Sequence, residues 1–180
     1  MSIRDNIKEI LVSEEQIKER SKELGAEITR DYKEKGSTPV VVGLLRGSVP
    51  FLAELIKYIE LDIIYDFMDV TSYVGTKSTG DIRILKDLET SVEDKDILIV
   101  EDIVDSGKTV AAVKELLKRR GAREVKVAAL LDKPAGRKID IEADYTGFVV
   151  GNYFVVGFGL DYNQHYRALP FVGVLNDDQY

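Results

Sequence analysis

The segment 97–110 reads ILIVEDIVDSGKTV and contains the densest group of side chains that could do chemistry. It opens with a run of apolar residues, which predicts a short strand buried on both faces. The polar residues that follow this strand are Glu101, Asp102, Asp105, Ser106, Gly107, Lys108 and Thr109. A helical pattern begins after them, so the polar stretch connects a strand to a helix.

Each part of this connection suits a particular ligand group. A turn at the carboxyl end of a strand lies where open α/β sheets bind ligands. Free N–H groups and the positive dipole end at the start of the next helix suit a phosphate. The adjacent acids Glu101 and Asp102 suit a hard cation or a pair of sugar hydroxyls. The segment therefore predicts a site for a phosphorylated sugar and a metal ion.

A second strand, polar turn and helix precede this segment. Residues 40–45 have the pattern of a buried strand, and Arg46-Gly47-Ser48 forms the polar turn after it. Pro50 lies in the first turn of a helix predicted to continue through Ile59. An earlier amphipathic helix is predicted from a capping box at Ser13 to about Gly36.

The stretch 71–80, TSYVGTKSTG, is rich in Gly, Ser and Thr and lies between strands predicted over 61–68 and 82–85. Its simplest interpretation is a hairpin loop. The same composition also suits a mobile lid that closes over a reacting site. Composition alone leaves both interpretations open.

The second half of the chain contains a helix predicted over 108–120 and a strand over 125–131. The turn after this strand carries Lys133. Shorter strand-like pieces follow at 145–150, 154–158 and 171–174. The only histidine, His165, is expected at the surface, and without a Ser or Cys partner it does not indicate a catalytic triad.

The alternation of strands and helices over 38–131 predicts an α/β fold with a mostly parallel sheet flanked by helices. The tail strands are expected to form a small cap over the carboxyl edge of this sheet. The 180 residues fit a single domain, 1–180, with a core at roughly 38–145. The N-terminal residues are expected to join the C-terminal segment in the cap.

Composition excludes several classes of function. A net charge of −7 disfavours binding to the phosphate backbone of nucleic acid. The absence of cysteine excludes disulfides, zinc–thiolate sites and a thiol nucleophile. The polar N-terminus lacks the apolar core of a signal peptide, and the apolar runs are too short to span a bilayer. A cytoplasmic protein without membrane partners is the expectation.

Two phosphate-related motifs can be set aside by spacing. A P-loop needs a glycine five residues before its Gly-Lys pair, and Asp102 occupies that position here. A receiver domain of two-component signalling places its Lys-Pro pair much further from its acidic pair than Lys133-Pro134 lies from Glu101-Asp102.

The run of apolar residues, Glu101-Asp102, two apolar residues and residues 105–109 resembles the phosphoribosyl-pyrophosphate signature of the type I phosphoribosyltransferases. Other segments resemble the hypoxanthine-guanine branch of that family, in the same order along the chain. These are the pyrophosphate loop at 44–48, the flexible catalytic loop at Ser72-Tyr73 with 78–81, the purine-pocket segments 130–134 and 154–162, and Arg167.

The resemblance implies transfer of the 5-phosphoribosyl group from phosphoribosyl pyrophosphate to N9 of hypoxanthine or guanine, giving IMP or GMP and pyrophosphate. It implies that residues 105–109 hold the 5′-phosphate. Glu101 and Asp102 would receive the ribose hydroxyls and help to bind Mg²⁺, and Asp105 would be the general base or acid at the purine N7.

The resemblance also implies roles for the remaining loops. It assigns the purine to Lys133, Phe154, Val155 and Asp161, with Lys133 donating to O6, Phe154 stacking on the ring and Asp161 binding a second Mg²⁺. It implies that pyrophosphate is bound by Arg46, Gly47 and Arg167. It also implies that the lid is closed by Ser72 and Tyr73. One departure is Thr71, where some relatives carry lysine, so a lysine role there is absent.

The resemblance implies a homodimer or homotetramer. The alternatives are a regulator with the same fold that binds nucleotides and nucleic acid, or an enzyme that prefers guanine and xanthine. The acidic charge and the lack of a basic stripe disfavour the regulator.

Overall fold

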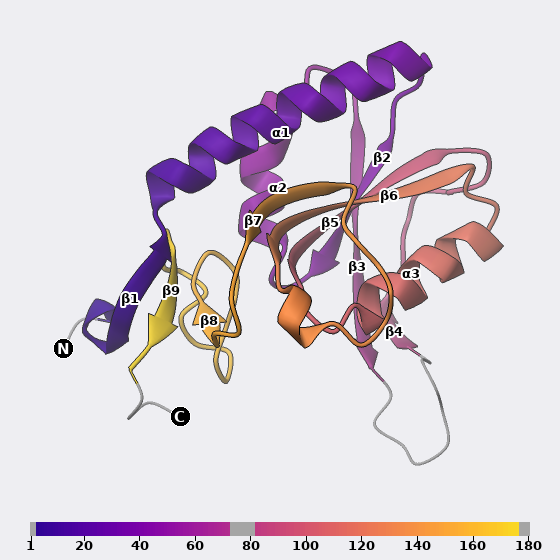
Figure 1. Ribbon diagram of the computed structural model, residues 1–180. Helices are drawn as coiled ribbons and strands as arrows, with labels where there is room; N and C mark the ends of the chain where they lie inside the picture. The colour runs from indigo at the N-terminus through magenta and orange to yellow at the C-terminus, as the bar shows by residue number, and fades with distance from the viewer. Residues whose placement is uncertain (1–2, 73–81, 177–180) are drawn as a thin grey trace.

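The main sheet contains six strands in the order β4-β3-β2-β5-β6-β7 (Figure 1). A computed structural model describes residues 3–72 and 82–176. The strands of this sheet are β2 Val40–Leu45, β3 Ile64–Ser72, β4 Ile82–Lys86, β5 Asp96–Val104, β6 Glu124–Asp132 and β7 Tyr145–Val149. All neighbours pair in parallel except β3 and β4, which pair antiparallel. The predicted mostly parallel α/β sheet is confirmed.

Helices cover both faces of this sheet (Figure 1). The helices are α1 Glu14–Lys35, α2 Val49–Leu55 and α3 Lys108–Arg119, with short 3-10 turns η1 Ile3–Asn6, η2 Ile56–Tyr58 and η3 Pro134–Gly136. Along β5, Leu98 and Val100 pack in the cluster that includes α1 and α2, whereas Ile97 and Ile99 pack in the cluster that includes α3. Side chains that alternate between two covered faces explain why this strand is apolar throughout its first half.

A second, smaller sheet joins the two ends of the chain. Its strands lie in the order β1-β9-β8, and their bounds are β1 Ile7–Val12, β8 Val155–Val156 and β9 Val172–Leu175. Both pairings are antiparallel. The sequence predicted strands near β8 and β9 but not β1.

Helix α1 begins and ends as its sequence indicates. The Ser13 hydroxyl accepts a hydrogen bond from the Gln16 N–H at 3.2 Å, and the Gln16 side chain accepts one from the Ser13 N–H at 2.8 Å. The helix ends at Gly36, whose φ of +67° places it in the left-handed region that favours glycine. The predicted capping box is confirmed.

Several predicted boundaries differ from the structure. The helix predicted through Ile59 ends at Leu55 and continues only as the 3-10 turn η2. The strand predicted over 61–68 is β3, which begins at Ile64 and extends to Ser72. Strand β5 runs beyond its apolar half to Val104, because β6 continues to pair with it as far as Asp132. Tertiary pairing therefore prolongs strands beyond the apolar pattern.

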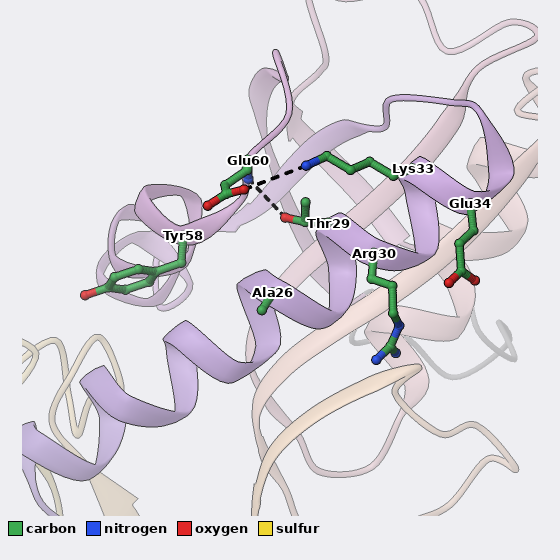
Figure 2. A pocket seen from close by; sticks show the side chains of 7 residues that line it. All are labelled: Ala26, Thr29, Arg30, Lys33, Glu34, Tyr58 and Glu60. Atoms are coloured by element: carbon green, nitrogen blue, oxygen red, sulfur yellow. Dashed lines mark hydrogen bonds and ion pairs between the residues drawn. The ribbon is translucent and has the colours of Figure 1, made fainter.

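The connection between η2 and β3 packs against α1 (Figure 2). The Thr29 hydroxyl accepts a hydrogen bond from the Glu60 N–H at 3.0 Å, and Lys33 forms an ion pair with Glu60 at 3.7 Å. A Cβ at Gly25 would lie 2.5 Å from the Cβ of Tyr58, so glycine permits this close approach. A cavity of about 380 Å³ lies here, on the outside of α1.

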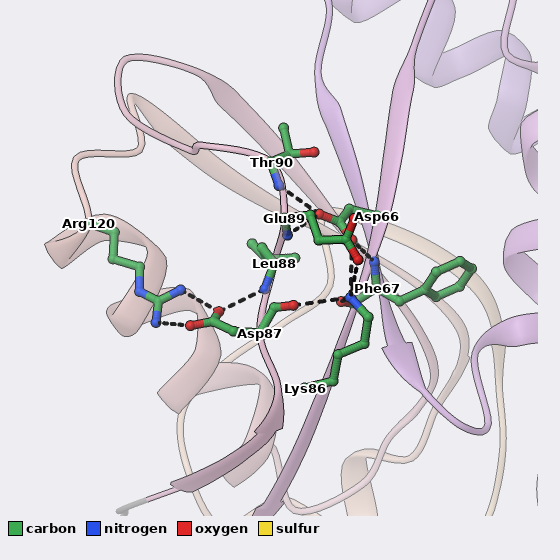
Figure 3. A network of polar contacts seen from close by, with 8 residues as sticks. All are labelled: Asp66, Phe67, Lys86, Asp87, Leu88, Glu89, Thr90 and Arg120. Atoms are coloured by element: carbon green, nitrogen blue, oxygen red, sulfur yellow. Dashed lines mark hydrogen bonds and ion pairs between the residues drawn. The ribbon is translucent and has the colours of Figure 1, made fainter.

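A buried carboxylate organises the segment that follows β4 (Figure 3). Asp66 is 8% exposed and accepts hydrogen bonds from the N–H groups of Phe67, Glu89 and Thr90 at 2.7–2.9 Å. Nearby, the Arg120 guanidinium contacts both carboxylate oxygens of Asp87 at 2.6 and 2.8 Å. These contacts attach the β4–β5 connection to β3 and to the end of α3.

No helix within residues 3–72 and 82–176 is long and apolar enough to cross a membrane.

Candidate active site

The predicted phosphate turn lies where β5 ends and α3 begins. Gly107 precedes α3 with a φ of +80°, and a Cβ there would lie 2.5 Å from a methyl carbon of Ile141. A cavity of about 110 Å³ opens beside this turn, lined by Glu101, Ile103, Val104, Asp105, Ser106, Gly107, Thr109 and Val110. Lys108 is exposed at the start of α3, and its N–H lies 3.4 Å from the Ser106 hydroxyl. The start of a helix beside a small cavity is suited to an anion.

A second cavity, of about 240 Å³, lies next to the first. Its lining residues are Asp102, Ile103, Asp105, Lys133, Tyr153, Phe154, Val155, Leu160 and Asp161. The structure thus brings together Lys133, Phe154, Val155 and Asp161, which the resemblance assigned to a purine. Asp105 lines both cavities, so ligands in the two cavities would meet at its carboxylate.

Lys133 points toward Asp105. Their side chains form an ion pair with Nζ and Oδ2 3.4 Å apart, and the Lys133 side chain is only 13% exposed. The Lys133 N–H also donates to the Val104 carbonyl at 3.0 Å, which ties the end of β6 to the end of β5. Phe154 lines the same cavity, and its ring meets that of Tyr162 edge to face at 5.6 Å. The lining therefore combines charged side chains with an aromatic ring.

The turn after β2 closes against the same site. A Cβ at Gly47 would overlap the Asp102 carboxylate, and a Cβ at Gly159 would overlap the Gly47 carbonyl oxygen. The peptide bond between Leu45 and Arg46 is cis. These close approaches place the Arg46-Gly47 turn directly beside the acidic pair.

Two of the predicted pyrophosphate residues, Arg46 and Arg167, share one neutral acceptor. The Gln164 amide oxygen lies 3.0 Å from a nitrogen of Arg167 and 3.4 Å from a nitrogen of Arg46. Arg167 also donates to the Gly159 carbonyl at 2.6 Å and forms an ion pair with Asp161 at 2.9 Å. Two guanidinium groups thus converge beside Asp102 and Asp161, which suits an anion carrying several charges.

Burial changes the ionisation of the acidic pair. Burial, followed by the neighbouring Asp102 carboxylate, raises the pKa of Glu101 well above its usual value. Burial raises the pKa of Asp102 to about 6, although Arg167 acts in the opposite direction. Adjacent acids that resist ionising together are prepared to receive a cation or hydroxyl donors.

The larger cavity on the outside of α1 (Figure 2) has none of these features. It is lined by Ala26, Thr29, Arg30, Lys33, Glu34, Tyr58 and Glu60, none of which lines the two cavities at the end of β5. The candidate site is therefore the pair of cavities at the carboxyl end of β5, which are smaller than this one.

Comparisons with known proteins agree with this location. Residues 9–163 match the model of the phosphoribosyl transferase domain. The chain is 56% identical to the hypoxanthine-guanine phosphoribosyltransferase of Lactococcus lactis, covering 97% of this chain and 94% of that protein. It is 50% identical to the Bacillus subtilis protein of the same name, covering 99% and 98%.

The chain belongs to the hypoxanthine-guanine phosphoribosyltransferase family.

The structure agrees with solved members of this family. A crystal structure of a hypoxanthine phosphoribosyltransferase from Staphylococcus aureus superposes with a TM-score of 0.94 at 47% identity, covering 99% of this chain and 96% of that one. The family membership predicted from the resemblance of residues 101–109 and the other loops is therefore confirmed.

The sequence analysis did not single out Tyr153 or Gln164. Tyr153 lines the larger cavity at the end of β5, together with Leu160 from the predicted segment 154–162, and Gln164 contacts two predicted pyrophosphate residues. Tyr153 adjoins Phe154, so a pair of adjacent aromatic residues was an available signal. Gln164 had no such signal, because its role depends on arginines from distant parts of the chain. Ser72 ends β3, and Tyr73 lies outside the described residues.

The Gly47 contact leads to a testable expectation. In Gly47→Ala the new methyl group would collide with the Asp102 carboxylate and displace either the turn or the acid. Such a displacement should raise KM for phosphoribosyl pyrophosphate on the order of 10–100-fold. Steady-state kinetics with each substrate varied in turn would measure this. An unchanged KM for phosphoribosyl pyrophosphate would contradict the assignment.

Proposed function

We propose that this chain transfers the 5-phosphoribosyl group from phosphoribosyl pyrophosphate to N9 of hypoxanthine or guanine, in purine salvage. The observation that carries the proposal is the position of Asp105 between a cavity suited to a phosphate and a cavity with a lysine and an aromatic ring. The names of relatives about half identical to the chain support the same reaction.

The smaller of the two cavities at the end of β5, of about 110 Å³, would hold the sugar phosphate. Backbone N–H groups and hydroxyls of Ser106 and Thr109, with the start of α3, would receive the 5′-phosphate. Glu101 and Asp102 would accept hydrogen bonds from the ribose 2′ and 3′ hydroxyls. This arrangement would aim the anomeric carbon at the neighbouring cavity.

The larger of the two cavities at the end of β5, of about 240 Å³, would hold the purine. Lys133 has donors and no acceptor, so it would favour a 6-oxo base over a 6-amino base. Phe154 would stack on the ring and the Val155 backbone would meet its edge. Asp105 would take or return the proton at N7 as the N9–C1′ bond forms and the bond from C1′ to pyrophosphate breaks.

The family implies Mg²⁺, and the residues present fit an ion that arrives with its substrate. Among residues 3–72 and 82–176, no group of three or more Asp, Glu, His or Cys residues is arranged to hold a metal. Mg²⁺ commonly uses only one or two carboxylates together with substrate phosphates, and Glu101 and Asp102 provide such a pair. Asp161, which also pairs with Arg167 at 2.9 Å, would ligate a second ion. When bound, Mg²⁺ would neutralise charge on the leaving pyrophosphate.

Departure of pyrophosphate would depend on the residues that the β2 turn and the C-terminal segment bring together. Arg46, Gly47 and Arg167 would hold it, and Gln164 would be displaced as the guanidinium groups turn to the anion. Ser72 and Tyr73 would close a lid over the site and so exclude water.

An assay of four purines tests the proposed function. The purified protein would be incubated with phosphoribosyl pyrophosphate, Mg²⁺ and each of hypoxanthine, guanine, xanthine and adenine, and nucleotide formation followed by absorbance. We expect turnover with hypoxanthine or guanine and little with adenine. Turnover with none of the four would overturn the proposal, and a preference for xanthine would redirect it within the family.

The family resemblance also leads to an expected oligomeric state and cellular location. We expect a homodimer or homotetramer with the Arg46 turn near an interface, and a cytoplasmic protein. Light scattering coupled to size-exclusion chromatography would measure the mass in solution. A single 20.2 kDa species at assay concentrations would contradict the expected assembly.

Lys133→Ala should separate purine binding from sugar-phosphate binding. Loss of a charged donor to O6 is worth about 1.5–3 kcal/mol, or roughly 10–100-fold in KM for hypoxanthine and guanine. KM for phosphoribosyl pyrophosphate should change far less, because Lys133 lines only the larger of the two cavities at the end of β5. Equal changes in both constants would remove Lys133 from the purine pocket.

A further inference from the structure

The loop between β5 and α3 is held from outside by the segment that follows β6. The Val104 carbonyl accepts hydrogen bonds from the Lys133 N–H and from the Arg137 guanidinium, both at 3.0 Å. The Asp105 carbonyl accepts a bond from the same Arg137 nitrogen at 2.9 Å. The Ser106 carbonyl accepts bonds from the N–H groups of residues 138 and 139 at 3.0 and 3.3 Å. Successive carbonyl groups of the loop therefore point toward one segment.

Arg137 is the side chain at the centre of this contact. Its other terminal nitrogen pairs with the Asp132 carboxylate, and both side chains are nearly buried, at 16% and 14% exposed. Its Cδ lies 3.3 Å from the position that a Cβ of Gly107 would take. One guanidinium thus joins the main chain of Asp105 to the end of β6, immediately before Lys133.

The direction of these carbonyl groups decides where the loop N–H groups point. In a trans peptide the C=O and the following N–H point in opposite directions. Bonds that draw the Asp105 and Ser106 carbonyls toward residues 137–139 therefore aim the Ser106 and Gly107 N–H groups the other way. The 110 Å³ cavity is lined by the loop and by none of residues 132–139, as expected if these N–H groups face it.

We infer that Arg137 is a positioning residue for both halves of the reaction. It orients the N–H groups that would receive the 5′-phosphate, and it sets the distance between Asp105 and Lys133 by linking their strands. This inference rests on the proposed function, since it names the residue that shapes that same site. No substrate group needs to touch Arg137 for this role.

The geometry requires arginine in particular. A guanidinium presents several donors in a fixed plane, so it can serve two carbonyls and a carboxylate at once, whereas an ammonium is a point charge on a flexible chain. Misplacement of reacting groups by about 1 Å can cost on the order of 10²-fold in rate. Arg137→Ala should therefore lower kcat about 10²-fold, and Arg137→Lys should recover only a small part of that loss.

Arg20 offers a matched control. Its guanidinium also donates to two main-chain carbonyls, those of Gly147 at 3.2 Å and Thr146 at 2.8 Å, but it lies on α1 outside the site. The experiment compares wild type, Arg137→Ala, Arg137→Lys and Arg20→Ala. It measures melting temperature, kcat, both KM values, rescue by added guanidinium well below denaturing concentrations, and amide hydrogen exchange of the peptide covering 104–109.

We expect Arg137→Ala to lose about 10²-fold in kcat, to raise KM for phosphoribosyl pyrophosphate and to regain part of its activity with guanidinium. Exchange in 104–109 should rise in this variant only. Arg20→Ala should keep kcat within about twofold even if it melts at a similar temperature. Equal losses of kcat in the two alanine variants, or kcat and exchange unchanged in Arg137→Ala, would overturn the inference.

Failure of the proposed function would look different. Wild-type protein would then turn over no purine, while the exchange of 104–109 would still report whether Arg137 orders the loop. Unchanged exchange in Arg137→Ala under those conditions would overturn the positioning role as well, and increased exchange would support it.

Discussion

Replacing Asp105 by alanine should reduce kcat by roughly 10²–10⁴-fold, the range typical of a general acid or base. The reason is its location, since Asp105 lines both cavities and its carboxylate lies 3.4 Å from the Lys133 ammonium. Asp105→Asn should fall in the same range, because an amide of the same shape accepts no proton at neutral pH. The measurement is steady-state turnover with saturating substrates.

Nucleotide binding should largely survive the same change. The N–H groups and hydroxyls of residues 106–109 remain in both Asp105 variants, and these are the groups proposed to bind the 5′-phosphate. Calorimetric titration with IMP or GMP would show Kd within about tenfold of wild type, a difference of 1.4 kcal/mol. Asp140→Asn is the control, since it removes an exposed acid from the neighbouring segment. Wild-type turnover in Asp105→Ala would refute the proton-transfer role.

Asp96→Asn should cause a large loss of stability without touching the site. Asp96 is 1% exposed at the start of β5 and receives two hydrogen bonds from Arg123 at 2.8 and 2.7 Å, with Lys35 at 2.9 Å. These contacts join the end of α1 to the starts of β5 and β6. Loss of hydrogen bonds to a buried charged group costs about 1.5–3 kcal/mol, which urea unfolding would measure.

Asp87→Asn is the matched control for this prediction. Asp87 also has a two-point contact with an arginine, Arg120, but its side chain is 47% exposed. Exposed ion pairs are worth about 0–1 kcal/mol. A loss in Asp87→Asn as large as that in Asp96→Asn would show that burial is not what gives Asp96 its effect.

The stabilisation by Asp96 should also depend on pH. The Arg123 hydrogen bonds lower the pKa of Asp96 well below its usual range, and Lys35 acts in the same direction against burial. Because the folded-state pKa lies below the unfolded value of about 3.9, the stabilisation is complete above that value and is lost as the pH falls below it. The difference between wild type and Asp96→Asn should be constant from about pH 5 to 7 and shrink below about pH 4. A constant difference down to pH 3 would contradict this.

Local elements were predictable from the sequence because their causes are local. The capping box at Ser13 and the glycine at Gly36 mark α1 through contacts within a few residues. The apolar start of β5 followed by residues 101–109 marks a strand, a turn and a helix start for the same reason. Boundaries that depend on neighbouring strands, such as the extension of β5 to Val104, were not predictable.

For the candidate site, residue identities were predictable from the sequence, whereas the distances between the residues were not. Asp105 and Gly107 were singled out by a contiguous motif after a predicted strand, and Lys133 was singled out only through the resemblance to the family. Their mutual distances did not follow, since they depend on how far β5 and β6 extend together. The roles of Gln164 and Arg137 also required the fold, because each contacts groups that only tertiary packing brings near.

The sequence by itself therefore determined the family, the α/β class and most of the residues proposed to touch substrate, because these are written in contiguous motifs and periodic patterns. Only the tertiary structure decided that the N-terminal residues form strand β1 and pair antiparallel with β9, that Gly47 closes against Asp102, and that Arg137 binds the main chain of the Asp105 loop. The physical reason is that these contacts join segments distant in sequence. Their energies depend on distances and directions that no local pattern specifies.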